Sequence, residues 1–158
     1  MIIIRPAAAT DEGFLLGLTN RLSAFPVPHW RSGMEIAVSD HHLILGALAA
    51  PTPETSLLIA ELEDGRAVAC ILTTTRADYF TQEAHAHVEV LAVDESAEGR
   101  GIGGALMAAA EGWAGSRGYR RITLNVFAAN DRARGVYEHL GYEPETVRYH
   151  KVLGPSGG

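Results

Sequence analysis

A cluster of glycines between an apolar segment and a helical segment restricts the fold more than any other feature of the sequence. Residues 90–93 are apolar, and after the cluster apolar residues recur at helical spacing over residues 102–113. A strand, loop and helix joined in this way present unpaired backbone N–H groups and the positive end of the helix to an anion. Glycine also lets a phosphate approach the backbone closely, because it has no Cβ. The stretch therefore predicts a phosphate-binding turn in an α/β protein; its glycines are Gly99, Gly101, Gly103 and Gly104.

The remaining patterns predict strands and helices on both sides of this turn. Asp64 and Gly65 are typical of a hairpin turn between two apolar runs. Pro26 and Pro28 cannot continue the first helix, and Gly141 suits the end of the last helix. We expect helices over residues 11–25, 31–50, 102–115 and 130–140, and extended segments over residues 2–4, 57–60, 68–72, 85–93, 122–126 and 142–153. This order predicts a mixed, mostly antiparallel, twisted sheet with helices on both faces.

The segment 85–93 alternates between apolar and polar residues, as a half-buried strand does. Its polar face is expected to line a cleft. The apolar face is predicted to carry Ala86, Val88, Val90 and Ala92, and the polar face His85, His87 and Glu89.

Composition limits the class of protein. The chain has 158 residues, enough for a single core, so we expect one domain over residues 1–153 and a flexible tail over residues 154–158. No apolar stretch approaches the roughly 18 residues of a membrane span, so we expect no membrane partner. A net charge of −6 argues against binding to nucleic acid, and the single Cys70 suits the cytoplasm. No metal site is expected, since two histidines without a third ligand are insufficient.

Two other phosphate-binding motifs fit the glycines less well. A Walker loop needs Gly-Lys-Ser/Thr, where this chain has Gly103, Gly104 and Ala105. Gly99, Gly101 and Gly104 satisfy the dinucleotide pattern, but no acid stands at residues 119–126, where the ribose ligand is expected. That pattern alone is a weak signal.

Two motifs together resemble the GNAT acyltransferase family. Its pyrophosphate motif, Gln/Arg-x-x-Gly-x-Gly/Ala, aligns with residues 98–103, with both glycines in place and Glu98 in place of Gln or Arg. A second signature is similar to residues 130–142, in which Asn130, Ala133, Tyr137 and Gly141 keep the family spacing. The resemblance covers nearly the whole chain and implies the GNAT acyl-CoA N-acyltransferase fold.

The resemblance also implies acetyl-CoA as the acyl donor. The pantetheine arm would lie along residues 89–93, the next strand would splay away to make room, and the pyrophosphate would meet the glycine loop. The side chain of Arg100 would either add charge there or be solvated, and Glu98 is assigned no binding role. The implied donor-binding residues are Leu91, Ala92, Val93, Gly99, Arg100, Gly101, Ile102, Gly103, Gly104, Asn130, Arg132, Ala133 and Tyr137.

Acyl transfer to an amine needs an oxyanion donor, a proton for the thiolate and a base for the amine. By resemblance, the backbone N–H of Leu91 polarises the acyl carbonyl and Tyr137 is the general acid, unless Tyr137 is a core aromatic. Glu89 is the first choice of base and His87 the second. Glu89 has the alternative role of orienting the acceptor, and a water chain is a third route for the proton.

The irregular segments beside the cleft are expected to bind the acceptor. These contacts are assigned to Trp30, Asp78, Tyr79, Phe80, His87, Glu89 and Asn125, of which Asn125 is equally an ordinary strand residue. The predicted function is direct transfer of an acetyl group to a primary amine of a small molecule in a ternary complex. Alternatives are a protein or peptide N-acetyltransferase and a non-catalytic acyl-CoA-binding module. A homodimer is expected from the resemblance.

Overall fold

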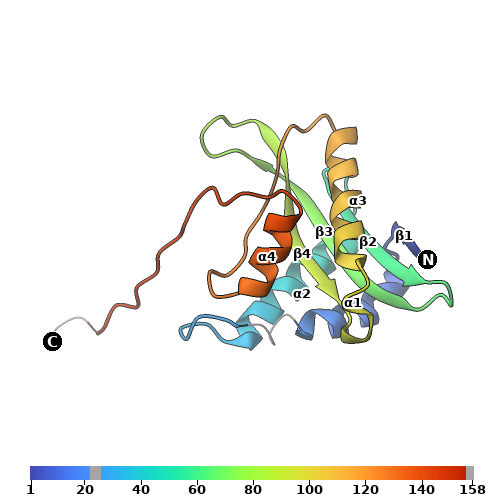
Figure 1. Ribbon diagram of the computed structural model, residues 1–158, viewed down its shortest axis with the longest axis horizontal. Coiled ribbons are helices and arrows are strands. Elements are labelled where there is room, and N and C mark those ends of the chain that lie inside the picture. The colour runs from blue at the N-terminus through green and yellow to red at the C-terminus, as the bar shows by residue number, and fades with distance from the viewer. Residues whose placement is uncertain (22–25, 156–158) are drawn as a thin grey trace.

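The computed structural model describes residues 1–21 and 26–155, and this part of the chain forms one five-stranded sheet flanked by helices (Figure 1). The strands follow the order β1-β2-β3-β4-β5. The first three pairings are antiparallel and the pairing of β4 with β5 is parallel, which confirms a mixed, mostly antiparallel sheet. The strands are β1 (Ile2–Pro6), β2 (Thr55–Leu62), β3 (Ala67–Ala77), β4 (Ala84–Val93) and β5 (Ile122–Leu124).

Helices cover both faces of the sheet, as the order of the elements predicts. They are α1 (Glu12–Thr19), α2 (Gly33–Ala49), α3 (Ile102–Ser116) and α4 (Asp131–His139), with short 3-10 turns η1 (Ala9–Asp11) and η3 (Glu95–Ala97). One core cluster joins α1 and α2 to the sheet through Leu15, Ile44 and Cys70. The other joins α3 to the opposite face through Leu106 and Val88, and α4 packs against it. Figure 1 shows β3 and β4 between these two layers.

Local signals account for the ends of several elements. The Ser32 hydroxyl accepts from the N–H of Glu35, whose carboxylate accepts from the N–H of Ser32, and this capping box starts α2. Gly65 has a φ of 82° in the turn between β2 and β3, a left-handed conformation that suits glycine. The predicted second helix and the predicted hairpin are therefore confirmed.

A β-bulge at Glu89 changes the predicted faces of β4. Thr73 pairs with Val88 and Leu72 pairs with Val90, so Glu89 has no residue opposite it on β3. A bulge of this kind places two successive residues on the same side of the sheet. Val88 therefore packs in the α3 cluster, whereas Val90 and Ala92 pack in the α1–α2 cluster. The prediction that Val88, Val90 and Ala92 share one face is wrong, because strict alternation does not continue through a bulge.

Three predicted boundaries also differ. The first helix was expected to extend to residue 25, but α1 ends at Thr19, and residues 22–25 lie outside the described residues. The strand expected over residues 122–126 ends at Leu124. The segment expected to be a last strand, residues 142–153, pairs with no strand in the described part of the chain. Extended character is a local property, whereas pairing needs an available edge at the right place.

No helix in residues 1–21 and 26–155 is long and apolar enough to cross a membrane. Of the predicted tail, residues 154 and 155 have no regular secondary structure, and residues 156–158 lie outside the described residues.

Candidate functional site

Strands β4 and β5 separate after a short parallel pairing at the end of the strand order. They pair only from Ala86 opposite Ile122 to Val88 opposite Leu124, although β4 continues to Val93. The edge of β4 over residues 89–93 therefore has no strand partner on the β5 side. The expected splaying of the strand after the glycine loop is present in the structure.

The direction of the backbone groups on this open edge follows from one hydrogen bond. The N–H of Asp94 donates to the carbonyl of Val68 at 2.7 Å, so it faces β3. N–H groups alternate in direction along an antiparallel strand, and the register from Leu91 to Val93 is regular. The N–H groups of Leu91 and Val93 therefore face the open edge. The Val93 carbonyl faces the same edge, where it accepts a hydrogen bond from Arg21 Nη1 at 2.8 Å.

The open edge leads directly into the glycine loop. Gly99 and Gly101 have φ values of 74° and 77°, which side chains with a Cβ rarely adopt, and Gly101 is the N-cap of α3. In the described part of the chain no acceptor binds the backbone N–H groups of residues 99–104. A row of free donors thus stands at the positive end of a helix of 15 residues, as an anion site requires.

The unusual acid beside the loop, Glu98, is ion-paired with two arginines. Its Oε1 lies 3.1 Å from Arg21 Nη2 and its Oε2 lies 3.5 Å from Arg132 Nη2. The carboxylate charge is therefore compensated next to the free donors, and two cations are held there.

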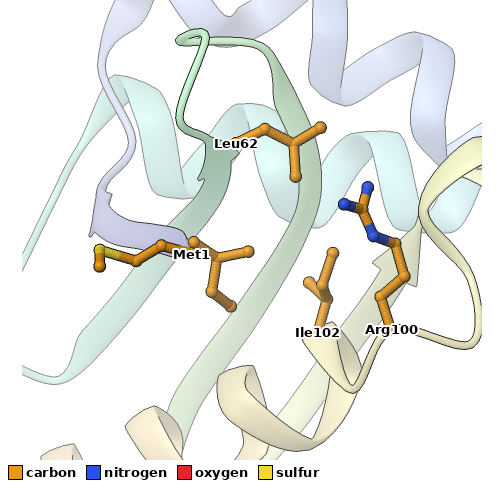
Figure 2. A pocket seen from close by; sticks show the side chains of 5 residues that line it. Met1, Leu62, Arg100 and Ile102 are labelled. Carbon is orange, nitrogen blue, oxygen red and sulfur yellow. The ribbon is translucent and has the colours of Figure 1, made fainter.

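The side chain of Arg100 lines a cavity beside β1 and β2. Figure 2 shows its guanidinium extending from the loop toward Leu62, into a cavity of about 200 Å³ that Met1, Ile2 and Ile102 also line. The backbone N–H of Arg100, rather than its side chain, belongs to the row of free donors.

Helix α4 places the residues of the second motif beside the same region. The Asn130 side chain caps the helix by accepting from the N–H of Ala133 at 3.2 Å. Tyr137 packs against the α3 cluster together with Leu91 and Val93, and its ring lies edge-on to Tyr142. Burial raises the pKa of the Tyr137 hydroxyl, so it keeps its proton at neutral pH. In the described part of the chain this hydroxyl makes no hydrogen bond.

A polar cluster occupies the α1–α2 face of β4, at the point where β4 and β5 separate. Glu89 Oε1 accepts from Thr74 Oγ1 at 2.8 Å and from Arg76 Nε and Nη2 at 2.9 and 2.6 Å. All three bonds reach the same oxygen, so Oε2 has no donor in the described part of the chain. Strand alternation places Glu89 on the same face as His87, together with Thr74 and Arg76 of β3.

The two histidines of β4 join the cluster through Thr123 of β5. Its hydroxyl lies 2.7 Å from His87 Nδ1 and 3.1 Å from His85 Nε2. Burial and the charge of Arg76 lower the pKa of His87, whereas the charge of Glu89 opposes them. His87 is therefore mainly neutral at pH 7 and able to accept a proton.

Asp40 of α2 is a further acid on this face, which the sequence patterns did not single out. Burial raises its pKa to about 6; His41 opposes this shift and Glu89 adds to it. Its carboxylate has no hydrogen bond among the described residues. The sequence predicts only that residues 31–50 are helical, which gives no signal for such a role of Asp40.

The predicted acceptor residues are spread over the molecule. Asp78 accepts from the N–H groups of Phe80 and Thr81 and pairs with Arg121, so it stabilises its own turn at the far end of β3 and β4. Tyr79 and Phe80 are exposed in that turn. The structure does not bring these three residues to Glu89, which lies about 16 Å along β4 at 3.3 Å per residue.

The other two acceptor predictions lie outside that turn. Asn125 directly follows β5 and is exposed. Trp30 precedes α2 and stacks on His150 with ring centroids 4.5 Å apart. Cys70 is fully buried between the sheet and α2, and burial raises the pKa of its thiol to about 12, so it is no nucleophile at neutral pH.

Comparison with known proteins adds one sequence relative and two solved structures. A stretch of 64 residues, 40% of this chain, is 44% identical to the mycothiol acetyltransferase of Beutenbergia cavernae, but it spans only 22% of that protein. The putative acetyl transferase from Pyrococcus furiosus aligns with a TM-score of 0.78 and 24% identity over 97% of this chain and 100% of that chain. AAC(6')-Iy in complex with the bisubstrate analogue CoA-S-monomethyl-acetylneamine aligns with a TM-score of 0.70 and 22% identity, over 97% and 99% of the two chains. These two structures share the fold.

Residues 18–142 match the acetyltransferase (GNAT) family. The matched residues include the open edge of β4, the glycine loop and the whole of α4. The chain therefore belongs to the GNAT family of acetyltransferases, in which acetyl-CoA is the acyl donor.

Proposed function

We propose that the protein transfers an acetyl group from acetyl-CoA directly to a primary amine of a small molecule, within a ternary complex. The observation that carries the proposal is the open edge of β4, which ends in free N–H donors on one side and in the Glu89 cluster on the other. A donor bound along this edge brings its thioester to the carboxylate and the imidazole.

In this arrangement the pyrophosphate accepts from the free N–H groups of residues 99–104, and the positive end of α3 stabilises its charge. Arg132 adds charge from α4. The pantetheine arm adds to the edge of β4 as a strand would, through the backbone of Leu91 and Val93. Acetyl-CoA thus lies between β4 and α4.

The N–H of Leu91 and the hydroxyl of Tyr137 serve the acyl group. The amine nitrogen attacks the thioester carbon, a C–N bond forms, and the N–H of Leu91 stabilises the oxyanion. When the C–S bond breaks, the sulfur takes the proton of the Tyr137 hydroxyl. Burial keeps that proton on Tyr137 until this step, because it raises the hydroxyl pKa.

Glu89 is the first candidate for the base that removes the proton of the amine. Its Oε2 is free to accept while Oε1 is held by Arg76 and Thr74, so the carboxylate is oriented without being fully occupied. His87 is the second candidate, since it is neutral at pH 7 and lies on the same face. Water is a possible carrier between either group and the amine.

The acidic face favours a cationic acceptor. Glu89 of β4 acts electrostatically on Asp40 of α2, and Trp30 stands before α2 with an aromatic surface. Direct transfer is supported by the burial of Cys70, because its protonated thiol cannot carry the acetyl group. The acceptor of the proposal is therefore a small amine that enters between α2 and β4.

Calorimetric titration with acetyl-CoA, with NADH and ATP as controls, tests the donor. Binding of acetyl-CoA alone supports the proposal, and its absence overturns it. Release of free thiol is then measured over a panel of small primary amines and of peptides. Release with small amines supports the acceptor class, release with peptides alone replaces it by a peptide acetyltransferase, and binding without any release indicates an acyl-CoA-binding module.

A further inference from the structure

A second cavity lies at the end of the sheet away from the glycine loop. It has a volume of about 290 Å³ and lies between the turn that joins β3 to β4 and the turn that follows α3. Figure 1 shows both turns at the upper end of the sheet, whereas the glycine loop is at the opposite end of α3. A helix of 15 residues is about 22 Å long, so this cavity is separate from the proposed donor site. Its volume is near the lower end of the roughly 300–1,000 Å³ of small-molecule pockets.

Hydrogen bonds hold both walls of this cavity in place. In the turn between β3 and β4, the N–H of Asp78 donates to the carbonyl of Glu83 at 2.8 Å. In the turn after α3, the Tyr119 hydroxyl lies 2.8 Å from Thr75 Oγ1 on β3. Arg121 Nη1 lies 3.3 Å from Asp78 Oδ2 and joins the two turns. A ligand therefore meets a cavity that is already formed, so binding costs little ordering of the chain.

The lining of the cavity has an excess of positive charge. Three arginines and two acids line it, which leaves one positive charge over: Arg117, Arg120 and Arg121 against Asp78 and Glu83. Arg117 Nη2 lies 3.7 Å from Glu54 Oε1, and Arg121 pairs with Asp78. Among the described residues Arg120 forms no ion pair, so its guanidinium donors are available to a ligand.

The arginines are not needed to complete the end of α3. Three of its last four carbonyls, those of Trp113, Ala114 and Gly115, accept from the backbone N–H groups of residues 117–119. The backbone itself thus satisfies most of the helix end. The guanidinium of Arg120 has no structural task there, and its position beside the cavity is left to binding.

His85 gives the cavity a buried nitrogen without a partner. The residue lines the cavity and is only 8% exposed. Its Nε2 lies 3.1 Å from Thr123 Oγ1, whereas its Nδ1 is buried and forms no hydrogen bond in the part of the chain that the structure describes. Buried polar atoms nearly always have a partner, because leaving one without a partner costs free energy. A ligand in the cavity supplies that partner.

We infer that this cavity binds a small anion that carries a carboxylate or a phosphate group. The guanidinium of Arg120 holds the anion, since its fork of N–H donors matches both groups. The Nδ1–H of His85 donates to the same ligand, which leaves Nε2 to accept from the hydroxyl of Thr123. Neither the glycine loop nor the open edge of β4 contributes to this site, so the inference does not depend on the proposed reaction.

Calorimetric titration of the full chain with inorganic phosphate, and separately with succinate, tests the site. Phosphate also suits the glycine loop, so each titration is repeated with Gly101→Val, which should keep the binding in the cavity. Arg120→Gln is expected to weaken this binding about tenfold or more. Arg148→Gln, an exposed arginine outside the cavity, is the matched control and should bind as the wild type does.

The two anions distinguish the possible ligand classes, because the one that binds more tightly identifies the group that the site prefers. Absence of binding by both anions overturns the inference. Binding that Gly101→Val abolishes and Arg120→Gln leaves unchanged also overturns it, since the anion then occupies the glycine loop.

Replacing Glu83 tests the sign of the ligand charge. Glu83→Gln removes an acid from the lining, so it should tighten the binding of the anion by up to about fivefold. Unchanged or weaker binding would contradict an anion at this place.

Nitrogen NMR of the imidazole side chains tests the contact with His85. The His85 signals are those missing from His85→Gln, whose amide nitrogen replaces Nε2 beside Thr123 and leaves no group in place of Nδ1. Phosphate should shift the Nδ1 signal of the wild type, and Arg120→Gln should need about tenfold more phosphate for the same shift. An Nδ1 signal that stays in place while phosphate binds overturns the site. The calorimetric test needs no change at His85, so it holds even where His85→Gln does not fold.

Discussion

Arg76 and Glu89, on neighbouring strands, form an ion pair in which Arg76 Nη2 lies 2.6 Å from Glu89 Oε1. The pair forms at the bulge in β4, where Glu89 has no residue opposite it on β3, and it fixes the carboxylate beside the open edge. The second oxygen is left without a donor among the described residues. The following predictions test what this arrangement does.

Replacing Glu89 tests the base. Glu89→Gln keeps the size of the side chain but cannot take up a proton, so kcat should fall by about 10² or more. The affinity for acetyl-CoA, measured by calorimetry, should be unchanged. Glu83→Gln, an exposed acid before β4, is the control and should keep full turnover. Wild-type kcat in Glu89→Gln would remove Glu89 from the reaction.

Replacing Arg76 tests through pH whether His87 can be the base. Burial is the largest cause that lowers the pKa of His87, and the charge of Arg76 is the second. Arg76→Gln therefore raises the pKa of His87, and if His87 is the base, the acidic limb of the kcat/KM profile moves to higher pH. The profile is measured with a saturating concentration of acetyl-CoA. An acidic limb that stays in place would assign the base to another group.

The hydroxyl of Tyr137 is expected to act in turnover alone. Tyr137→Phe removes the proton for the leaving thiolate, so kcat should fall by about 10² while the affinity for acetyl-CoA changes little. Tyr119→Phe is the matched control, since that hydroxyl bonds to Thr75 at the far end of the sheet. Equal kcat values for Tyr137→Phe and the wild type would contradict the assignment.

Gly101 is predicted to be essential for donor binding. Gly101→Val places a branched side chain at a φ of 77° and above the free N–H groups, so acetyl-CoA binding should be lost. Gly65→Val is the control for strain, because Gly65 has a φ of 82° in a hairpin turn away from the loop. Both variants should lose about 1–2 kcal/mol of stability. Only Gly101→Val should lose binding in calorimetry, and retained binding would show that the loop is not the phosphate site.

The raised pKa of Asp40 predicts a dependence of stability on pH. Burial raises this pKa from 3.8 to about 6. Between these pH values the folded chain holds a proton that the unfolded chain has lost, so stability falls as the pH rises through the window. Asp40→Asn should therefore be more stable than the wild type at pH 7 by about 1 kcal/mol, a value reduced for partial exposure.

Urea unfolding at a series of pH values measures this difference, which should shrink toward zero near pH 4. Glu138→Gln, an exposed acid on α4, is the control and should show no such trend. A difference in stability that does not vary with pH would mean that the pKa of Asp40 is not raised in the folded chain. The same variant should raise the KM for a cationic acceptor if the acidic face binds it.

Much of the fold was predictable because its signals are local. The glycines before α3, the Asp64-Gly65 turn and the Asn130 cap each act within a few residues, and the structure has all three. The two motifs also led to the family, since their spacing lies within single elements. Patterns of this kind depend on backbone conformation and on the period of helices and strands.

Other features depended on contacts between distant parts of the chain. Arg21 and Glu98 are 77 positions apart, and no pattern in the sequence links them. The bulge at Glu89 has no glycine or proline to mark it, and it moved Val90 and Ala92 to the other face.

The sequence by itself determined where a phosphate can bind and which elements surround it. Only the tertiary structure decided which charges meet, where β4 and β5 separate and which strand edge stays free, because these depend on how several elements pack at once.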